Sequence, residues 1–240
     1  MRTHAVAMHM SDGLVNGTTS LLFGAVAVIA LAIAVTRARA DLDDRTAPMA
    51  GLVTAFVFAV QMINFPILPG ASGHLLGGAL VAILVGPWVG TICIAIVLVV
   101  QCLLFADGGL TALGMNITNM AVIGVFTGFL VALALRRLAV RSRGGLIVTA
   151  FVAAFLNTVV ASLGFVLEYA IGGAGGASLG TVLVLMVGLH ALIGIGEGVI
   201  TAATVGAVAA IRPDLVYLLR GAPGSALARR SGVEAGGGVA

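Results

Sequence analysis

The stretch that decides the fold is "TSLLFGAVAVIALAIAVT", residues Thr19–Thr36, which contains no charged side chain. A helix that crosses the ~30 Å hydrocarbon core of a bilayer needs about 20 predominantly apolar residues. The run ends at "RARADLDDR", residues 37–45, where the density of charge is too high for lipid. These features predict a first transmembrane helix.

Outward from this segment, the chain repeats the same pattern. Hydrophobic residues make up 60% of the 240 and charged residues only 9%, whereas soluble domains carry about 25% charged residues. We therefore predict an all-α, polytopic membrane protein of the plasma membrane with about seven transmembrane helices. The six further apolar runs are residues 47–64, 74–86, 89–105, 115–135, 146–169 and 179–211.

Basic residues set the expected orientation. All twelve are arginines, and they follow the first, fifth and seventh apolar runs: Arg37, Arg39, Arg45, Arg136, Arg137, Arg141, Arg143, Arg212, Arg220, Arg229 and Arg230, with only Arg2 elsewhere. With seven spans these clusters share one face, which the positive-inside rule makes cytoplasmic. The N-terminus is then outside and the C-terminus cytoplasmic. Because the arginines lie in short loops between apolar runs, a nucleic-acid partner is not expected.

The segment "TRARAD" offers a second interpretation of the first run, because it ends in an A-x-A-like site typical of a cleaved signal peptide. The preceding segment is poorly basic and contains Asp12. We therefore favour a retained first span.

Two histidines mark a candidate binding site on the outer side. His9 precedes the first span, and His74 follows the Pro/Gly-rich break "FPILPGASG". Either could be an interfacial histidine that faces water. Polar residues gather at the same predicted depth, however, either to bridge helices or to line a capture site: Gln61, Asn64, Gln101, Asn116, Asn119 and Glu168.

The stretch "AMHMSDG", residues 7–13, permits a specific chelate if the mature chain starts at Met8. The α-amine, the amide nitrogen of His9 and its imidazole Nδ1 can close two fused rings around one metal. A second imidazole from His74 would complete four nitrogens in a plane, which suits Ni(II), Cu(II) or low-spin Co(II) better than Zn(II). If Met1 is the start, the amine lies seven residues away and this chelate cannot form.

Several long motifs carry a family resemblance: "MHMSDGLVNG", "QMINFPILPGASGHLLGGAL", "ILVGPWVG", "VQCLLFADGGLTALGMNITNM" and "HALIGIGEGVIT". Over roughly residues 8–211 the chain resembles the substrate-capture subunit of cobalt and nickel energy-coupling-factor transporters, of the CbiM/NikM type. The resemblance implies metal ligands at Met8, His9 and His74. Ser11 stands where the family has a proline.

The resemblance also implies a function, partners and a domain plan. It implies ATP-driven capture of Co²⁺ for cobalamin biosynthesis, or of Ni²⁺, with no catalytic cofactor. The partners would be a transmembrane coupling subunit, ATPase subunits and a small two-span accessory subunit. Residues 1–7 would be a misassigned start or a removed extension, 8–220 the metal-capture domain, and the Gly-rich 221–240 a disordered cytoplasmic tail.

Four other residues receive secondary roles. We expect Asp12 to hydrogen-bond the His9 imidazole from outside the metal shell, although Asp-Gly is also a common turn. Asn64 could brace the His74 loop or simply end a helix. His190 and Glu197 are seven apart on one helical face, and we interpret Glu197 as a helix-packing or partner-coupling residue.

Two other functions compete with metal capture. An intramembrane metalloenzyme using His190 and Glu197 would need a third ligand and a base, and the HExxH spacing is absent. A secondary transporter would need acidic residues in mid-span, and only Glu197 qualifies. The sequence has no Walker A motif, so the chain is not expected to be an enzyme or to hydrolyse ATP itself.

Overall fold

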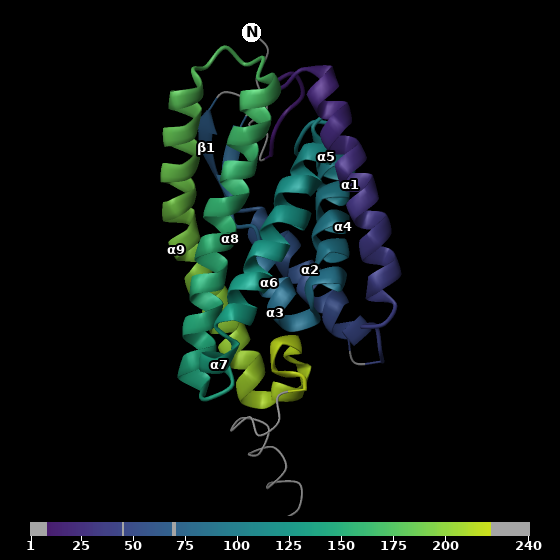
Figure 1. The fold of residues 1–240 in the computed structure, drawn as a ribbon, viewed down its shortest axis with the longest axis vertical. Coiled ribbons are helices and arrows are strands. Elements are labelled where there is room, and N and C mark those ends of the chain that lie inside the picture. Colours follow the sequence, from purple (N-terminus) through teal and green to yellow (C-terminus); the bar gives the residue numbers. More distant parts are fainter. Residues whose placement is uncertain (1–8, 45, 69–70, 222–240) are drawn as a thin grey trace, which may run out of the picture.

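The computed structural model describes residues 9–44, 46–68 and 71–221. The predicted 1–7 extension, the predicted ligand Met8 and all of the predicted tail except Gly221 lie outside these residues. Figure 1 shows an elongated bundle of helices with a small hairpin beside one end. Its elements are α1 (Gly17–Ala38), α2 (Thr46–Gln61), β1 (Asn64–Leu68), β2 (Ala71–His74), α3 (Gly78–Val85), α4 (Pro87–Phe105), α5 (Leu113–Asn116), the π-helix η1 (Ile117–Gly124), α6 (Val125–Ala134), α7 (Arg136–Ala139), α8 (Arg143–Gly172), α9 (Leu179–Ile211) and the 3₁₀ turns η2 (Pro213–Leu215) and η3 (Tyr217–Leu219).

Polar caps and glycines fix where the long helices begin. The side chains of Asn16, Ser142 and Ser178 each accept the backbone N–H three residues later, at the starts of α1, α8 and α9. Such caps satisfy donors that the first helical turn leaves without a partner. Between α3 and α4, Gly86 adopts φ +90° and Pro87 opens the next helix, which separates the two without a long loop.

Among the described residues, five long spans and a shorter apolar helix stand against the expectation of about seven spans. In the described part of the chain, five helical segments are long and apolar enough to cross a membrane: α1, α4, the continuous stretch Leu113–Ala134, α8 and α9. Helix α2 is apolar but shorter. The expected third span is wrong as a crossing helix, because α3 has only eight residues and extends about 12 Å at 1.5 Å per residue.

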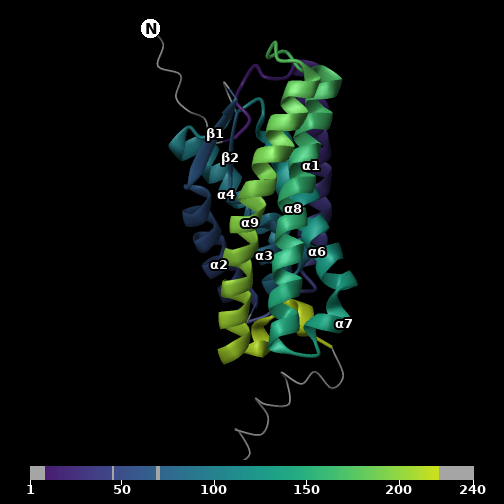
Figure 2. The same cartoon turned by 90° about the vertical axis from the view of Figure 1, so that its left-hand side faces the viewer.

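Helix α3 forms the centre of the bundle instead of a span. All eight of its residues are buried, and it contacts α2, α4, α6, α8 and α9. Figure 2 shows it enclosed between the longer helices. A helix that is apolar on every side belongs in a core, so its uniform hydrophobicity reflects protein contacts on all sides.

In the part of the chain that the structure describes, the fold is all-α as expected, apart from one short β-hairpin that the sequence analysis did not predict. β1 and β2 pair antiparallel, with Asn64 opposite His74 and Phe65 opposite Gly73, and the register shifts between Pro66 and Leu68. Pro66 has no N–H to donate, which is compatible with a two-stranded edge and a bulge. The hairpin carries the chain from the end of α2 back toward the bundle and ends at His74.

The outer surfaces agree with a lipid environment. Large apolar side chains on α1 are exposed, including Leu21 at 79% and Val28 at 67%. The arginine-bearing segments after α1, α6 and α9 lie at one end of the bundle, and the hairpin lies toward the other (Figure 1). The two ends of the described chain are therefore on opposite ends of the bundle.

Candidate metal-capture site

The segment that contains His9 is fixed to α5 and to the loop before it. Asn116 bonds the backbone of Met10 on both sides: its Oδ1 accepts the Met10 N–H at 3.2 Å and its Nδ2 donates to the Met10 carbonyl at 3.3 Å. The Gly109 N–H also donates to that carbonyl at 3.0 Å. These bonds hold the segment against the bundle and place the His9 side chain inside it, where it is only 3% exposed.

The imidazole of His9 contacts a carboxylate that the sequence analysis did not assign to it. Its Nδ1 lies 3.0 Å from Oδ1 of Asp107, and both side chains are buried. Its Nε2 is buried without a hydrogen-bond partner among the described residues. The ring therefore has one nitrogen held by a carboxylate and one with no partner in this part of the chain.

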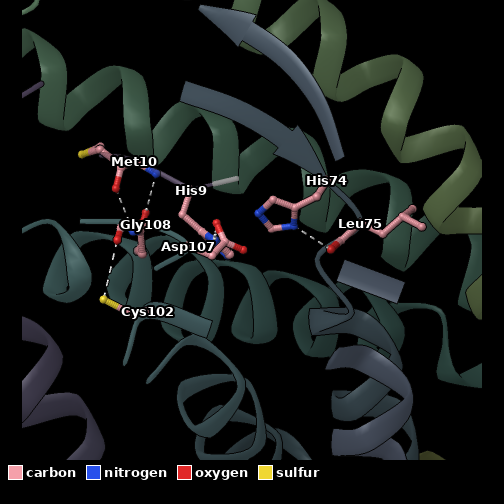
Figure 3. Close-up of polar contacts among 8 residues, drawn as sticks. His9, Met10, His74, Leu75, Cys102, Asp107 and Gly108 are labelled. Atoms are coloured by element: carbon pink, nitrogen blue, oxygen red, sulfur yellow. Dashed lines mark hydrogen bonds and ion pairs between the residues drawn. The ribbon is translucent and has the colours of Figure 1, made fainter. Parts of the chain in front are cut away.

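The hairpin places the His74 ring next to the His9 ring. Its ring centroid is 4.4 Å from that of His9, with the planes tilted by 52°. Figure 3 shows His74 next to His9, with Asp107 beside His9. His74 Nδ1 lies 2.9 Å from the Leu75 carbonyl, which can only accept a hydrogen bond. The proton is therefore on Nδ1, and Nε2 carries the lone pair.

Burial also keeps His74 neutral. Its pKa is lowered well below the usual 6.5, chiefly because burial removes water from the charged form and then because His9 and His190 lie nearby. The hydrogen bond to Leu75 opposes this shift only in part. A neutral imidazole is the form that binds a transition metal.

The two rings line an internal cavity with a third histidine. His190 Nδ1 lies 2.8 Å from the Met186 carbonyl, which again leaves Nε2 as the nitrogen with the lone pair. The other side chains around the cavity are Met10, Leu76, Asn116, Asn119, Met120, Ala161, Ser162, Phe165 and Met186. Among the described residues, no group of three or more His, Cys, Asp and Glu side chains is arranged to hold a metal ion, so side chains in this part alone do not complete a metal site.

The expected hydrogen bond from Asp12 to His9 is wrong. Asp12 is exposed, and its Oδ1 accepts from the Thr111 N–H at 2.8 Å and from the Thr111 hydroxyl at 2.5 Å. Asp107 contacts the His9 ring instead. Both carboxylates belong to neighbouring segments of the same end of the bundle, and their positions in the sequence do not tell which one reaches the ring.

The polar residues that were expected to gather near the site lie in two different locations. Asn116 and Asn119 line the cavity, whereas Glu168 lies behind Asn119 and accepts its amide N–H at 2.7 Å. Gln61 donates to the Leu76 carbonyl at 2.7 Å, behind the His74 loop. The backbone of Asn64 pairs with His74, so Asn64 is adjacent to the site through the hairpin.

An apolar bundle with five candidate membrane-crossing segments and buried histidines on an internal cavity is a polytopic membrane protein. The family model for the "Cobalt uptake substrate-specific transmembrane region", CbiM, matches residues 9–215. The chain therefore belongs to the CbiM family of cobalt and nickel transporter substrate-specific components.

Relatives and solved structures agree with this membership. The chain is 40% identical over 217 residues to the "Putative fused nickel transport protein NikMN" of Archaeoglobus fulgidus, covering 90% of this chain and 70% of that protein. It is 31% identical over 228 residues to the "Cobalt transport protein CbiM" of Sorangium cellulosum, covering 91% and 100%. The fold is similar to the crystal structure of a transition metal transporter, with a TM-score of 0.78 and 28% identity over 89% of this chain and all of that one.

Proposed function

We propose that this chain captures Co²⁺ outside the cell for an ATP-driven importer that supplies cobalamin biosynthesis. The observation that carries the proposal is the buried pair of imidazoles, His9 and His74, with centroids 4.4 Å apart on one cavity. Two imidazoles within reach of a single ion suit a transition metal of this kind. Membership of the CbiM family supports the same function.

The proposed ligands are four nitrogens. Three belong to the start of a mature chain that begins at Met8: the α-amine, the amide nitrogen of His9 and its Nδ1. The fourth is Nε2 of His74, the nitrogen that keeps its lone pair while Nδ1 bonds Leu75. The amine and the amide lose protons on binding, so affinity falls in acid.

Asp107 has a defined part in this proposal. In the described structure it bonds the same His9 Nδ1 that the chelate needs. Capture therefore exchanges the Asp107 contact for the metal at that nitrogen. The carboxylate stays beside the ring, where its negative charge offsets part of the charge of the incoming cation.

The proposed orientation and partners follow the arginine-rich end of the bundle. We place that end in the cytoplasm and the His9–His74 end outside. Family membership supports an energy-coupling module as partner, with a transmembrane coupling subunit, ATPase subunits and a small two-span accessory subunit. The module would supply the energy for inward release, since the sequence contains no Walker A motif.

Nickel uptake by the same mechanism is the second candidate. The relative from Archaeoglobus fulgidus, at 40% identity, carries a nickel transport name, and the same four nitrogens accept Ni²⁺. An intramembrane metalloenzyme and a secondary transporter have no comparable support.

Metal titration of the purified chain starting at Met8 tests the proposal. Co²⁺ and Ni²⁺ in direct competition identify the preferred ion. The variants His9→Ala and His74→Ala should each lose high-affinity binding, whereas Val205→Ala, a change in the buried part of α9, should bind as the parent does. Retention of parental affinity by both histidine variants would reject metal capture at this site.

A further inference from the structure

The short loop after His74 is held by hydrogen bonds from side chains of two helices, α2 and α9. On one side, the Gln61 amide of α2 donates to the Leu76 carbonyl at 2.7 Å. On the other side, the carboxylate of Glu197 in α9 accepts the Leu76 N–H at 2.6 Å on Oε2 and the Gly77 N–H at 2.6 Å on Oε1. Both sides of this loop are therefore fixed by side chains that are remote in sequence.

The two amides that Glu197 accepts mark the beginning of α3. Gly77 is the N-cap residue of that helix and makes no side-chain cap bond of its own. The first N–H groups of a helix have no partner within it, and they carry the positive end of the helix dipole. Glu197 accepts the N–H of the N-cap residue Gly77 and that of Leu76, the residue before it, so α9 supplies a carboxylate at the positive end of α3.

The loop has little freedom to find another position. Gly77 adopts φ +78°, and the position that a Cβ would take is 2.7 Å from both Val57 methyl carbons. Glu197 is 2% exposed and Leu76 is 3% exposed, so the bond to the Leu76 N–H is shielded from water, whereas Gly77 is half-buried. The position of the backbone after His74 is consequently fixed by the Glu197 carboxylate together with Gln61 and the close packing against Val57.

We propose that Glu197 is a positioning residue for metal capture. By capping α3 from α9, it holds the loop that directs His74 toward His9. If Glu197 only packed helices together, a substitution that preserves its shape would leave the metal site unaffected. If Glu197 positions the loop, its carboxylate itself is necessary. This inference rests on the proposed function, in which His74 is a metal ligand.

A double-mutant cycle tests the inference on the full chain starting at Met8, with Cu²⁺ as the probe. Copper is the tightest binder in the divalent series, so the remaining chelate stays measurable when His74 is replaced. Glu197→Gln keeps the shape of the side chain but places an N–H against one of the two backbone N–H donors, Leu76 and Gly77. We therefore expect about 10- to 100-fold weaker Cu²⁺ binding and a shifted ligand-field absorption band. In a His74→Ala background, Glu197→Gln should change neither quantity.

Two further variants separate positioning from folding. Thr201→Val alters a buried residue one turn along α9, beside the same loop, and should leave affinity and spectrum unchanged. Glu197→Asp keeps the carboxylate with a shorter reach, and should restore part of the affinity lost in Glu197→Gln. If Glu197→Gln does not fold, the double-mutant cycle is repeated with Glu197→Asp. The loss of affinity caused by Glu197→Asp must then disappear in the His74→Ala background.

The outcomes distinguish this inference from the proposed function. Parental binding by Glu197→Gln, or equal weakening with and without His74, overturns the positioning role. Parental binding by His74→Ala would instead reject the proposed metal site itself.

Discussion

The rings of His9 and His74 lie with centroids 4.4 Å apart, although one belongs to the segment before α1 and the other to the end of β2. The structure brings them together by two independent devices. The bonds of Met10 to Asn116 and Gly109 fix the first ring, and the hairpin and the capped start of α3 fix the second. Each device gives a prediction that can be tested separately.

Gly77→Ala should destabilise the protein more than Gly176→Ala. Both glycines have a positive φ, +78° and +75°, so both substitutions incur about 1–2 kcal/mol of left-handed strain. Only at position 77 would the new Cβ also meet Val57, which adds about 1–3 kcal/mol of overpacking. Thermal unfolding in detergent measures the difference, and equal shifts in Tm would show that the His74 loop is not tightly enclosed.

His74 should contribute no proton when metal binds at pH 7. Because burial lowers its pKa well below 6.5, the ring is already neutral, and protons compete with the metal for it only at pH values below that lowered pKa. Calorimetry of Cu²⁺ binding in buffers of different ionisation enthalpy should give the same number of released protons for the parent and for His74→Ala. A release about one proton larger in the parent would contradict a neutral His74.

Asp12→Ala should weaken metal binding modestly through His9. Asp12 holds the segment to Thr111 by two hydrogen bonds, and at this exposed position we expect a loss of about 1 kcal/mol, which is roughly fivefold in affinity. The matched change Asp214→Ala removes an exposed carboxylate that pairs with Arg212 beyond the end of α9. If both variants bind alike, the contact between Asp12 and Thr111 does not support the site.

The sequence predicted the long helices well and the central segment poorly. Length and hydropathy locate α1, α4, α8 and α9, because a span in lipid needs only a long apolar run. They do not separate a short helix enclosed by protein from a short helix in lipid, so α3 was expected to be a span. The hairpin escaped prediction because its strands are brief and Pro66 argues against a strand.

The site was predicted in part, for similar physical reasons. Helix direction placed His9 and His74 at the same end of the bundle, and the structure brings them together. The sequence analysis expected Asp12 at the His9 ring, but Asp107 contacts it instead, because distance along the chain does not measure distance in space. The seven-residue spacing put His190 and Glu197 on one face of α9, but only the fold shows that one lines the cavity and the other caps α3.

The central claim is that a free α-amine at Met8 and the imidazoles of His9 and His74 hold one metal ion. The most direct measurement compares Ni²⁺ binding by a chain that starts at Met8 with binding by a chain that retains residues 1–7. We predict tight binding with the absorption of square-planar nickel for the first chain, and loss of that absorption for the second. The same affinity and spectrum in both chains would contradict the account.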